Sequence, residues 1–336
     1  MPSPDEQAQE KARPPLVVIL GPTAVGKTSL SLELAARFDG EIVGADSRQI
    51  YHGMDIGTAK PSAAEQARVP HHLVDIQPPD RQMALATYQQ MAFSVIDAIH
   101  NRGRVPFLVG GSALYLRAVT EGLQIPEVPP NPVLRAELEA FAQENGRAAL
   151  HARLQSSDPD AAAQIHPNNM RRVIRALEIV QTTGRRKSEL ESAAPPPYRI
   201  LKIGLDLPRP ILHERIDRRV HEMVAAGLVE EMASLLAAGY SPDLPSLSSL
   251  GYQEVAAHLR GEMTLAVAVE RIQIETHRFV RHQYTWFRRI PDIHWFDISQ
   301  APPPDIRNLV ESFLYRDRFH NDGSAREEAC QETATR

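Results

Sequence analysis

The feature that most constrains this chain is an apolar run that continues without a break into a glycine-rich turn. Residues 15–20 read Pro-Leu-Val-Val-Ile-Leu, and residues 21–28 read Gly-Pro-Thr-Ala-Val-Gly-Lys-Thr, a complete GxxxxGK[ST] motif. Leu30, Leu34 and Phe38 then recur at helical spacing. A buried strand, this turn and a helix in that order are typical of a phosphate-binding loop in a parallel α/β sheet.

The residue types in this turn suit phosphate oxygens. Gly21 and Gly26 let the backbone wrap inward, so that amide N–H groups and the start of the following helix point at an anion. Lys27 adds a mobile positive charge, and Thr28 offers a hydroxyl to Mg²⁺. We therefore expect the chain to bind a polyphosphate or a diphosphate through the whole turn, which comprises Gly21, Pro22, Thr23, Ala24, Val25, Gly26, Lys27 and Thr28.

Length and composition indicate one large core with a smaller satellite domain, because 43% of the 336 residues are apolar. No apolar run approaches the length of about 18 residues that a membrane span requires, and the N-terminus has no hydrophobic signal core, so we expect a cytoplasmic protein without membrane partners. The lone Cys330 excludes an internal disulfide and a cysteine-based zinc site. With a net charge of −5, any nucleic-acid site must be a local patch.

Strand-like runs alternate with helical patterns in the first third of the chain, which predicts a parallel sheet. The predicted strands are 16–20, 41–45, 72–76, 105–109, 198–206 and 294–298. A proline-rich connector after Gly122 leads into segments that read only as helices, at 132–145, 147–155, 159–165 and 169–183. Further helices are predicted at 209–226, 228–238, 264–289 and 305–315.

The predicted fold class is α/β, with a P-loop NTPase-like parallel sheet core and an all-helical insertion domain. The first part of the core spans 14–122, the helical insertion spans 123–198, and the second part of the core with its C-terminal helices spans 199–316. We expect disordered tails at 1–13 and 317–336, because the C-terminal tail is charged and poorly apolar.

Asp46 and Ser47 follow the second predicted strand, at the edge of the sheet where open α/β folds bind ligands. The carboxylate could take a proton, cap a helix or bind Mg²⁺. The segment 49–60 holds two glycines among several kinds of polar group and reads as a binding loop.

A second glycine turn, Gly110-Gly111-Ser112, brings a hydroxyl to the same edge, where Ser112 could cap its helix, contact a ligand, or both. At the end of the strand that corresponds to 105–109, a nucleotide-hydrolysing P-loop protein typically carries a second Mg²⁺-binding aspartate. The comparable candidate in this chain is Asp75.

Two arginine clusters could follow an RNA backbone. Arg171, Arg172 and Arg175 share one helical face in the insertion. Segment 271–289 carries five arginines against one glutamate, interleaved with aromatic residues that include Phe279 and Trp286. RNA is held through its phosphates and by stacking of unpaired bases on aromatic rings. Alternatively, the arginines form a charged face that only contacts water, and the aromatic residues belong to the core.

Seven segments, in this order, resemble the bacterial tRNA dimethylallyltransferase family. They are the turn at 21–28, Ala-Asp-Ser-Arg-Gln-Ile-Tyr, Met-Asp-Ile-Gly-Thr-Ala-Lys-Pro, Pro-His-His-Leu-Val-Asp-Ile, Leu-Val-Gly-Gly-Ser-Ala-Leu-Tyr, Asn-Met-Arg-Arg-Val-Ile-Arg-Ala-Leu-Glu and Arg-His-Gln-Tyr-Thr-Trp-Phe. The resemblance implies transfer of a dimethylallyl group from dimethylallyl diphosphate to the exocyclic N6 amine of the adenosine 3′-adjacent to the anticodon in tRNA, with release of diphosphate. On this basis the loop holds a prenyl diphosphate and not ATP.

The resemblance also assigns residues and partners. It implies Asp46 as the catalytic base, diphosphate contacts from Lys27, Ser112 and an arginine that is Arg219 or Arg215, and Mg²⁺ as cofactor at Thr28. Relatives usually carry threonine at position 112. The implied partners are the tRNA anticodon stem-loop and dimethylallyl diphosphate, and we expect a monomer. The implied tRNA-binding residues are Asp46, Ser47, Arg48, Gln49, Arg135, Arg171, Arg172, Arg175, Gly251, Tyr252, Arg281, Gln283, Trp286 and Arg288.

Three other functions remain open at this point. A small-molecule kinase would use the loop for ATP and Asp46 to deprotonate a hydroxyl, but it would need a second Mg²⁺ ligand. Prenylation of free adenylate would leave the arginine clusters without a role. A non-catalytic RNA-binding P-loop module would tolerate loss of Asp46.

Overall fold

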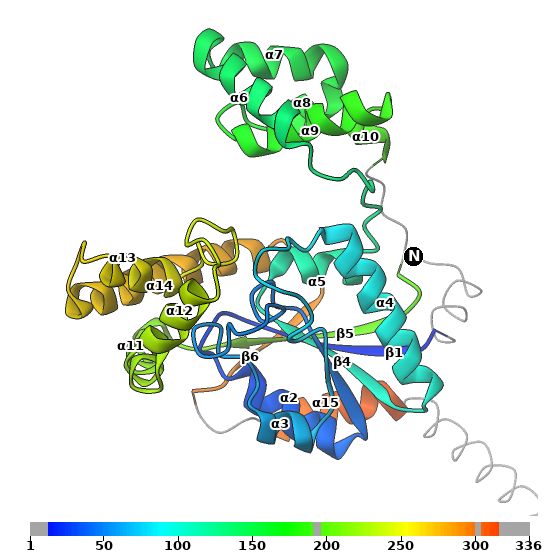
Figure 1. Ribbon diagram of the computed structural model, residues 1–336. Helices are drawn as coiled ribbons and strands as arrows, with labels where there is room; N and C mark the ends of the chain where they lie inside the picture. The colour runs from blue at the N-terminus through cyan, green and yellow to red at the C-terminus, as the bar shows by residue number, and fades with distance from the viewer. Residues whose placement is uncertain (1–12, 191–195, 300–303, 316–336) are drawn as a thin grey trace, which may run out of the picture. The chain divides into compact units, whose positions relative to one another are not determined.

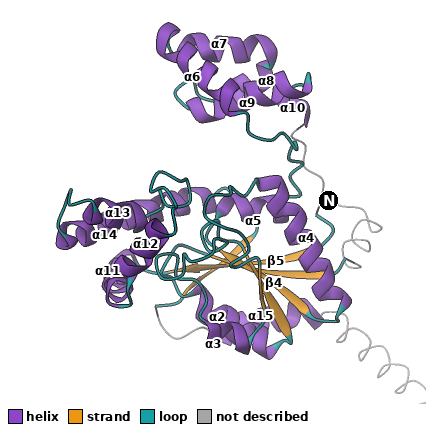
Figure 2. Cartoon of the chain, viewed as in Figure 1, coloured by secondary structure: helices purple, strands orange, loops and turns teal. Residues whose placement is uncertain are grey.

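The computed structural model describes residues 13–190, 196–299 and 304–315. In these ranges the strands form a single parallel sheet in the order β3-β2-β4-β1-β5-β6 (Figures 1 and 2). The strands are β1 (Pro15–Leu20), β2 (Gly40–Gly44), β3 (His71–His72), β4 (Val105–Gly110), β5 (Arg199–Asp206) and β6 (Ile293–Asp297). The α/β fold class predicted from the sequence is confirmed.

The apolar run at residues 15–20 forms β1, a central strand of the sheet. Residues 16–20 of β1 are at most 1% exposed, because β4 and β5 flank the strand and helices cover both faces of the sheet. α2 (Lys27–Arg37) and α15 (Pro304–Tyr315) pack on one face, and residues 91–101 of α4 (Leu85–Asn101) lie across the other (Figure 1). A strand buried on both sides reads as a continuous apolar run rather than an alternating one.

The remaining helices extend this core or form the insertion. They are α3 (Ala63–Arg68), α5 (Ala113–Thr120), α6 (Pro132–Asn145), α7 (Arg147–Ser157), α8 (Pro159–Gln164), α9 (Met170–Thr183), α10 (Lys187–Leu190), α11 (Arg209–Ala225), α12 (Leu228–Ala237), α13 (Tyr252–Leu259) and α14 (Leu265–Phe287). Within the described residues, no helix combines the length and apolarity that a membrane crossing requires.

The prediction of a strand over 72–76 was wrong beyond its first residue. Leu73 and Asp75 have φ values of 58° and 57°, which turn the chain out of the sheet ladder. The Asp75 N–H instead donates to the Gln49 carbonyl at 2.9 Å, so this segment pairs with the turn after β2. The carboxylate of Asp75 therefore lies in a loop and not at a strand end.

Two glycines allow the loops at the carboxyl edge of the sheet to approach closely. A Cβ on Gly110 would lie 2.0 Å from the Ala45 carbonyl oxygen, and one on Gly21 would lie 2.7 Å from the Leu205 carbonyl oxygen. Any larger residue would force these backbones apart. The edge consequently gathers the glycine-rich turn after β1, the Asp46 turn after β2 and the Gly110-Gly111 turn after β4.

The chain divides into two compact units. One comprises 1–82, 91–116 and 197–336 and contains the sheet; the other comprises 83–90 and 117–196 and is helical. The helical unit has its own core, in which Leu150, Leu154 and Val173 are almost fully buried. Its limits lie close to the 123–198 insertion of the sequence analysis, although it begins earlier and includes the start of α4. The tails predicted at 1–13 and 317–336 lie, apart from Arg13, outside the described residues.

Candidate active site

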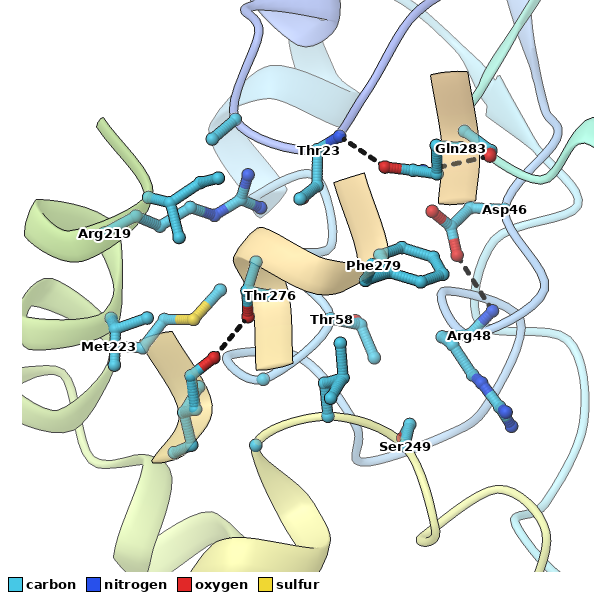
Figure 3. A pocket seen from close by; sticks show the side chains of 18 of the residues that line it. Thr23, Asp46, Arg48, Thr58, Arg219, Met223, Ser249, Thr276, Phe279 and Gln283 are labelled. Atoms are coloured by element: carbon cyan, nitrogen blue, oxygen red, sulfur yellow. Dashed lines mark hydrogen bonds between the residues drawn. The ribbon is translucent and has the colours of Figure 1, made fainter. Parts of the chain in front are cut away.

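A cavity of about 390 Å³ lies at the carboxyl edge of the sheet (Figure 3). Thr23 and Lys27 of the glycine-rich turn, Asp46, Ser112 and Arg219 all border it. They come from the ends of β1, β2 and β4 and from α11. The structure thus brings together all four residues that were predicted to be catalytic.

Lys27 is held inside the glycine-rich turn. Its Nζ donates to the carbonyl oxygens of Gly21 at 3.0 Å and Pro22 at 2.8 Å. Burial lowers the pKa of Lys27 to about 8; the charge of Asp46 opposes this shift and that of Arg219 adds to it. The lysine is therefore a cation near neutral pH whose proton is easily lost in mildly alkaline solution.

The Asp46 turn is fixed by hydrogen bonds to backbone N–H groups. The Arg48 N–H donates to Oδ1 of Asp46 at 2.9 Å, and the Ser47 N–H donates to Oγ of Ser112 at 2.9 Å. The Ser112 hydroxyl in turn donates to Oγ of Ser47 at 3.2 Å. Ser112 therefore holds the turn that presents Asp46 to the cavity.

Two arginines of α11 approach the glycine-rich turn differently. Nη1 of Arg215 donates to the Val25 carbonyl oxygen at 3.4 Å, which ties α11 to the turn. Within the described residues no hydrogen bond or ion pair holds the guanidinium of Arg219, which extends toward the turn at Thr23 (Figure 3). Burial lowers the pKa of Arg219, and the charge of Asp46 opposes that shift. Arg219 is the better placed of the two to meet an anion.

A second cavity of about 420 Å³ adjoins the same residues. Gly26, Thr28 and Arg215 border it, and it shares Thr23, Lys27, Asp46 and Arg219 with the first cavity. The glycine-rich turn and the two arginines thus face a common space. An anion in this space would meet donors from both sides.

One wall of the first cavity is apolar, and sequence reasoning did not identify it. Ile216, Val220 and Met223 of α11 line it, together with Leu228, Leu250, Ile272 and Phe279. The first three residues are spaced i, i+4 and i+7, with Arg219 on the same face. That spacing marks any buried helix face, so only its combination with a polar arginine could have signalled a binding site.

Residues predicted to bind tRNA include several that the structure uses to build the cavity wall. The Tyr252 side chain is fully buried, and its hydroxyl donates to Oε1 of Glu231 at 2.6 Å. The Glu231 carboxylate also accepts the N–H groups of Asp55, Ile56 and Gly57. The RNA-facing position expected for Tyr252 is therefore corrected to a supporting one behind the 54–58 loop, since its ring offers no surface to a ligand.

Three more residues that were predicted to bind tRNA make hydrogen bonds within the protein: Arg48, Gln49 and Gly251. Nε2 of Gln49 donates to the carbonyl oxygens of Thr58 and Ala59, and Nη1 of Arg48 donates to the Pro245 carbonyl oxygen. The Gly251 N–H donates to Oε2 of Glu254 at 2.8 Å. Arg48 and Gly251 also border the first cavity, and Gln49 borders the second.

α14 separates its aromatic residues into buried and exposed groups. Phe287 is fully buried, whereas Phe279 is 44% and Trp286 is 40% exposed. Phe279 lines the cavity, and the Arg289 guanidinium lies 5.3 Å from the centroid of the Trp286 ring. The alternative that Phe279 and Trp286 are core residues is thus wrong. Arg281 and Arg288 are exposed as well.

The four arginines of the helical unit that were predicted to bind tRNA divide into two pairs. Arg171 and Arg172 are exposed on α9. Nε and Nη2 of Arg135 both donate to the buried Glu178 carboxylate at 2.9 Å, and Arg175 pairs with the same carboxylate. The expected face of three free cations on α9 is therefore reduced to Arg171 and Arg172, because Arg175 and Arg135 are engaged by a buried anion.

The donor set of the site fits Mg²⁺ carried on a phosphate ligand. Thr28 is exposed at the start of α2, and its hydroxyl and the Asp46 carboxylate border the same cavity. Among the described residues, no group of three or more His, Cys, Asp or Glu side chains could enclose a metal ion. Mg²⁺ commonly keeps waters and takes few protein ligands beside substrate phosphates. Asp75 pairs with Lys60 and His52 and borders neither cavity.

Comparison with known proteins identifies the family. A family model described as IPP transferase matches residues 49–290. A curated relative from Thermomicrobium roseum, named tRNA dimethylallyltransferase, is 50% identical over 311 residues, which cover 92% of this chain and 94% of the relative. A relative of the same name from Roseiflexus sp. (strain RS-1) is 56% identical over 303 residues, covering 89% and 99%.

Solved structures agree with these sequence relatives. The full-length tRNA isopentenylpyrophosphate transferase from Bacillus halodurans matches with a TM-score of 0.67 at 42% identity, covering 91% of this chain and 99% of that one. A eukaryotic dimethylallyltransferase, solved acting on tRNA, matches with a TM-score of 0.76 at 26% identity, covering 92% and 80%. By sequence and by structure, the chain belongs to the IPP transferase family, the family of tRNA dimethylallyltransferases.

Proposed function

We propose that this chain transfers a dimethylallyl group from dimethylallyl diphosphate to the exocyclic N6 amine of the adenosine 3′-adjacent to the anticodon in tRNA. The observation that supports the proposal is the cavity in which the Asp46 carboxylate, the phosphate-binding turn, Arg219 and an apolar wall meet. An allylic diphosphate needs an anion site beside an apolar surface, and an amine nucleophile needs a base beside both.

Asp46 is proposed as the base. The lone pair of the adenine amine is delocalised into the ring, so the amine attacks carbon poorly unless a positioned group accepts its proton. A bond forms between N6 and the first carbon of the dimethylallyl group while the bond from that carbon to the diphosphate oxygen breaks. The electron pair of the broken bond leaves with the diphosphate, and the N6 proton passes to the Asp46 carboxylate.

Lys27 and Arg219 are proposed to stabilise the departing diphosphate. Negative charge accumulates on it as the allylic bond breaks, and fixed donors that already face that charge lower the barrier. Arg219 meets this requirement because no protein group occupies its guanidinium within the described residues. Lys27 can exchange its two carbonyl partners in the turn for phosphate oxygens. Ser112 acts through the Asp46 turn that it holds.

Mg²⁺ is the proposed cofactor, held by the Thr28 hydroxyl beside the diphosphate. When bound, the ion would offset part of the charge of the diphosphate. The apolar wall formed by Ile216, Val220 and Met223 would receive the hydrocarbon part of the donor.

The RNA partner is proposed to be the anticodon stem-loop. The target base is stacked in that loop and must be extruded to reach Asp46 inside the cavity. Exposed arginines of two helices, Arg281 and Arg288 of α14 and Arg171 and Arg172 of α9, are available to RNA phosphates. The cytoplasmic location and the monomeric state stay predictions.

One experiment tests the proposed function against its rivals. Radiolabelled dimethylallyl diphosphate is offered with tRNA, with AMP and with neither, and ATP consumption is followed in parallel. We expect label in tRNA alone and no ATP turnover. Label in AMP would favour adenylate prenylation, ATP turnover would favour a kinase, and label in neither acceptor would leave an RNA-binding module.

A further inference from the structure

We propose that Gln283 is a positioning residue for the diphosphate site and not an RNA contact, the role that the family resemblance implies for it. The inference rests on the proposed function and refines it. Gln283 lies on α14, close in sequence to the exposed Arg281 and Arg288, but its own side chain is only 6% exposed.

Both polar atoms of the Gln283 side chain are used inside the protein. Oε1 accepts the Thr23 N–H at 3.0 Å, and Nε2 donates to the Gly111 carbonyl oxygen at 3.1 Å (Figure 3). A donor on one side and an acceptor on the other fix the orientation of the amide group. Each polar atom of this amide therefore already has a partner inside the protein, and the residue borders the first cavity from within the wall.

The two backbone partners of Gln283 belong to loops that follow adjacent strands. Thr23 lies in the glycine-rich turn after β1, and Gly111 lies in the turn after β4. A Cβ on Gly111 would lie 2.8 Å from Nε2 of Gln283, so the amide reaches this backbone only because residue 111 is glycine. The side chain joins the two turns across the edge of the sheet.

This link completes a path from the phosphate-binding turn to the candidate base. Gly111 is followed by Ser112, whose hydroxyl holds the Ser47 N–H in the Asp46 turn. Gln283 thus fixes the turn that binds the leaving group relative to the turn that carries the carboxylate. It also engages the Thr23 N–H, a group of the glycine-rich turn that was predicted to face phosphate.

The test separates donor binding from RNA binding in the full-length chain. Gln283→Met removes both hydrogen bonds at similar volume, and Gly111→Ala displaces the amide while keeping Gln283. Gln273→Met, a matched change on the same helix, is the control because Gln273 borders none of the cavities described above. Each variant is titrated with inorganic diphosphate and, separately, with an anticodon stem-loop RNA, and steady-state kinetics give KM for dimethylallyl diphosphate.

Both Gln283→Met and Gly111→Ala are expected to weaken diphosphate binding and raise the donor KM by about tenfold, the scale of a misplaced hydrogen bond to a charged group. Stem-loop affinity should stay within about twofold of that of the unaltered chain, as expected for a residue that makes no RNA contact. Reduced stem-loop affinity with unchanged diphosphate affinity would assign Gln283 to RNA and overturn the inference. An equal loss of both affinities, or no change in either, would overturn it too.

A failure of the proposed function would look different. The unaltered chain would then bind diphosphate without transferring label to tRNA. The effect of the two substitutions on diphosphate affinity would still be measurable in that case, because the titration does not depend on turnover.

Discussion

Replacing Asp46 with asparagine tests the proposed base with little disturbance to its surroundings. The Arg48 N–H donates to Oδ1 of Asp46, and asparagine keeps an oxygen at that position. The Ser112 hydroxyl holds the neighbouring Ser47 N–H, so the turn retains a second anchor. We therefore expect Asp46→Asn to fold normally and to present an amide where the carboxylate lies.

The expected loss is confined to the chemical step. A positioned general base typically contributes a factor of about 10² to 10⁴, and a value near 10³ corresponds to about 4 kcal/mol of barrier. Single-turnover transfer of labelled dimethylallyl to tRNA, with both substrates saturating, measures this step directly. Stem-loop affinity should remain within about twofold, because asparagine keeps the size of the side chain and the oxygen that accepts the Arg48 N–H.

Asp75→Asn is the matched control, since Asp75 is the other aspartate that the sequence suggested near a strand end. Its carboxylate pairs with Lys60 and His52 and borders neither cavity. We expect its transfer rate to lie within about threefold of that of the unaltered chain, because Asp75 is partly exposed and ion pairs of that kind contribute little. A rate for Asp46→Asn within tenfold of the unaltered chain, or a matching loss in stem-loop affinity, would refute Asp46 as the base.

The remaining predictions concern charge. The kcat/KM for the donor should fall as pH rises through about 8, because the free protein loses the Lys27 proton there, and Lys27→Met should lack this step. Glu178→Gln should lower the free energy of unfolding at pH 7 by about 2 to 4 kcal/mol, measured by denaturant titration, since it leaves two arginines facing a neutral amide. Burial opposes ionisation of Glu178, but hydrogen bonds from Arg135, Asn131 and Arg175 outweigh it and lower its pKa to about 2, so this stabilisation is present above pH 4.5 and is lost as pH falls toward 2. Replacing Arg171 and Arg172 with alanine should reduce the salt slope of stem-loop binding by about 1 to 2, and an unchanged slope would mean that these side chains are only solvated.

The sequence was most informative where chemistry depends on neighbouring residues. The glycine-rich turn, the Asp46 turn and the Gly110-Gly111-Ser112 turn were each predicted at a strand end, and parallel pairing brings those ends together. Helix bounds in the insertion were also close, as for α6, which spans Pro132–Asn145 as predicted. In that helix, Asn131 caps the first turn and Pro132 follows it, both strong local signals.

The sequence was least informative where a side chain finds a partner far along the chain. Gln283 contacts Thr23 across 260 positions, and Arg135 meets Glu178 across 43. Nothing in the local pattern distinguishes such a glutamine or arginine from one that faces solvent. The strand predicted at 72–76 was too long for a related reason, since Leu73 and Asp75 are not glycines and nothing in the sequence signals their left-handed backbone.

A crystal structure with a stable analogue of dimethylallyl diphosphate and an anticodon stem-loop would show whether Asp46 acts on the extruded adenine beside the donor. We predict the diphosphate group between the glycine-rich turn and Arg219, the hydrocarbon chain against Ile216 and Val220, and the extruded adenine with N6 in hydrogen-bond contact with Asp46. An adenine amine held away from that carboxylate, or a nucleoside triphosphate bound productively in the turn, would contradict it.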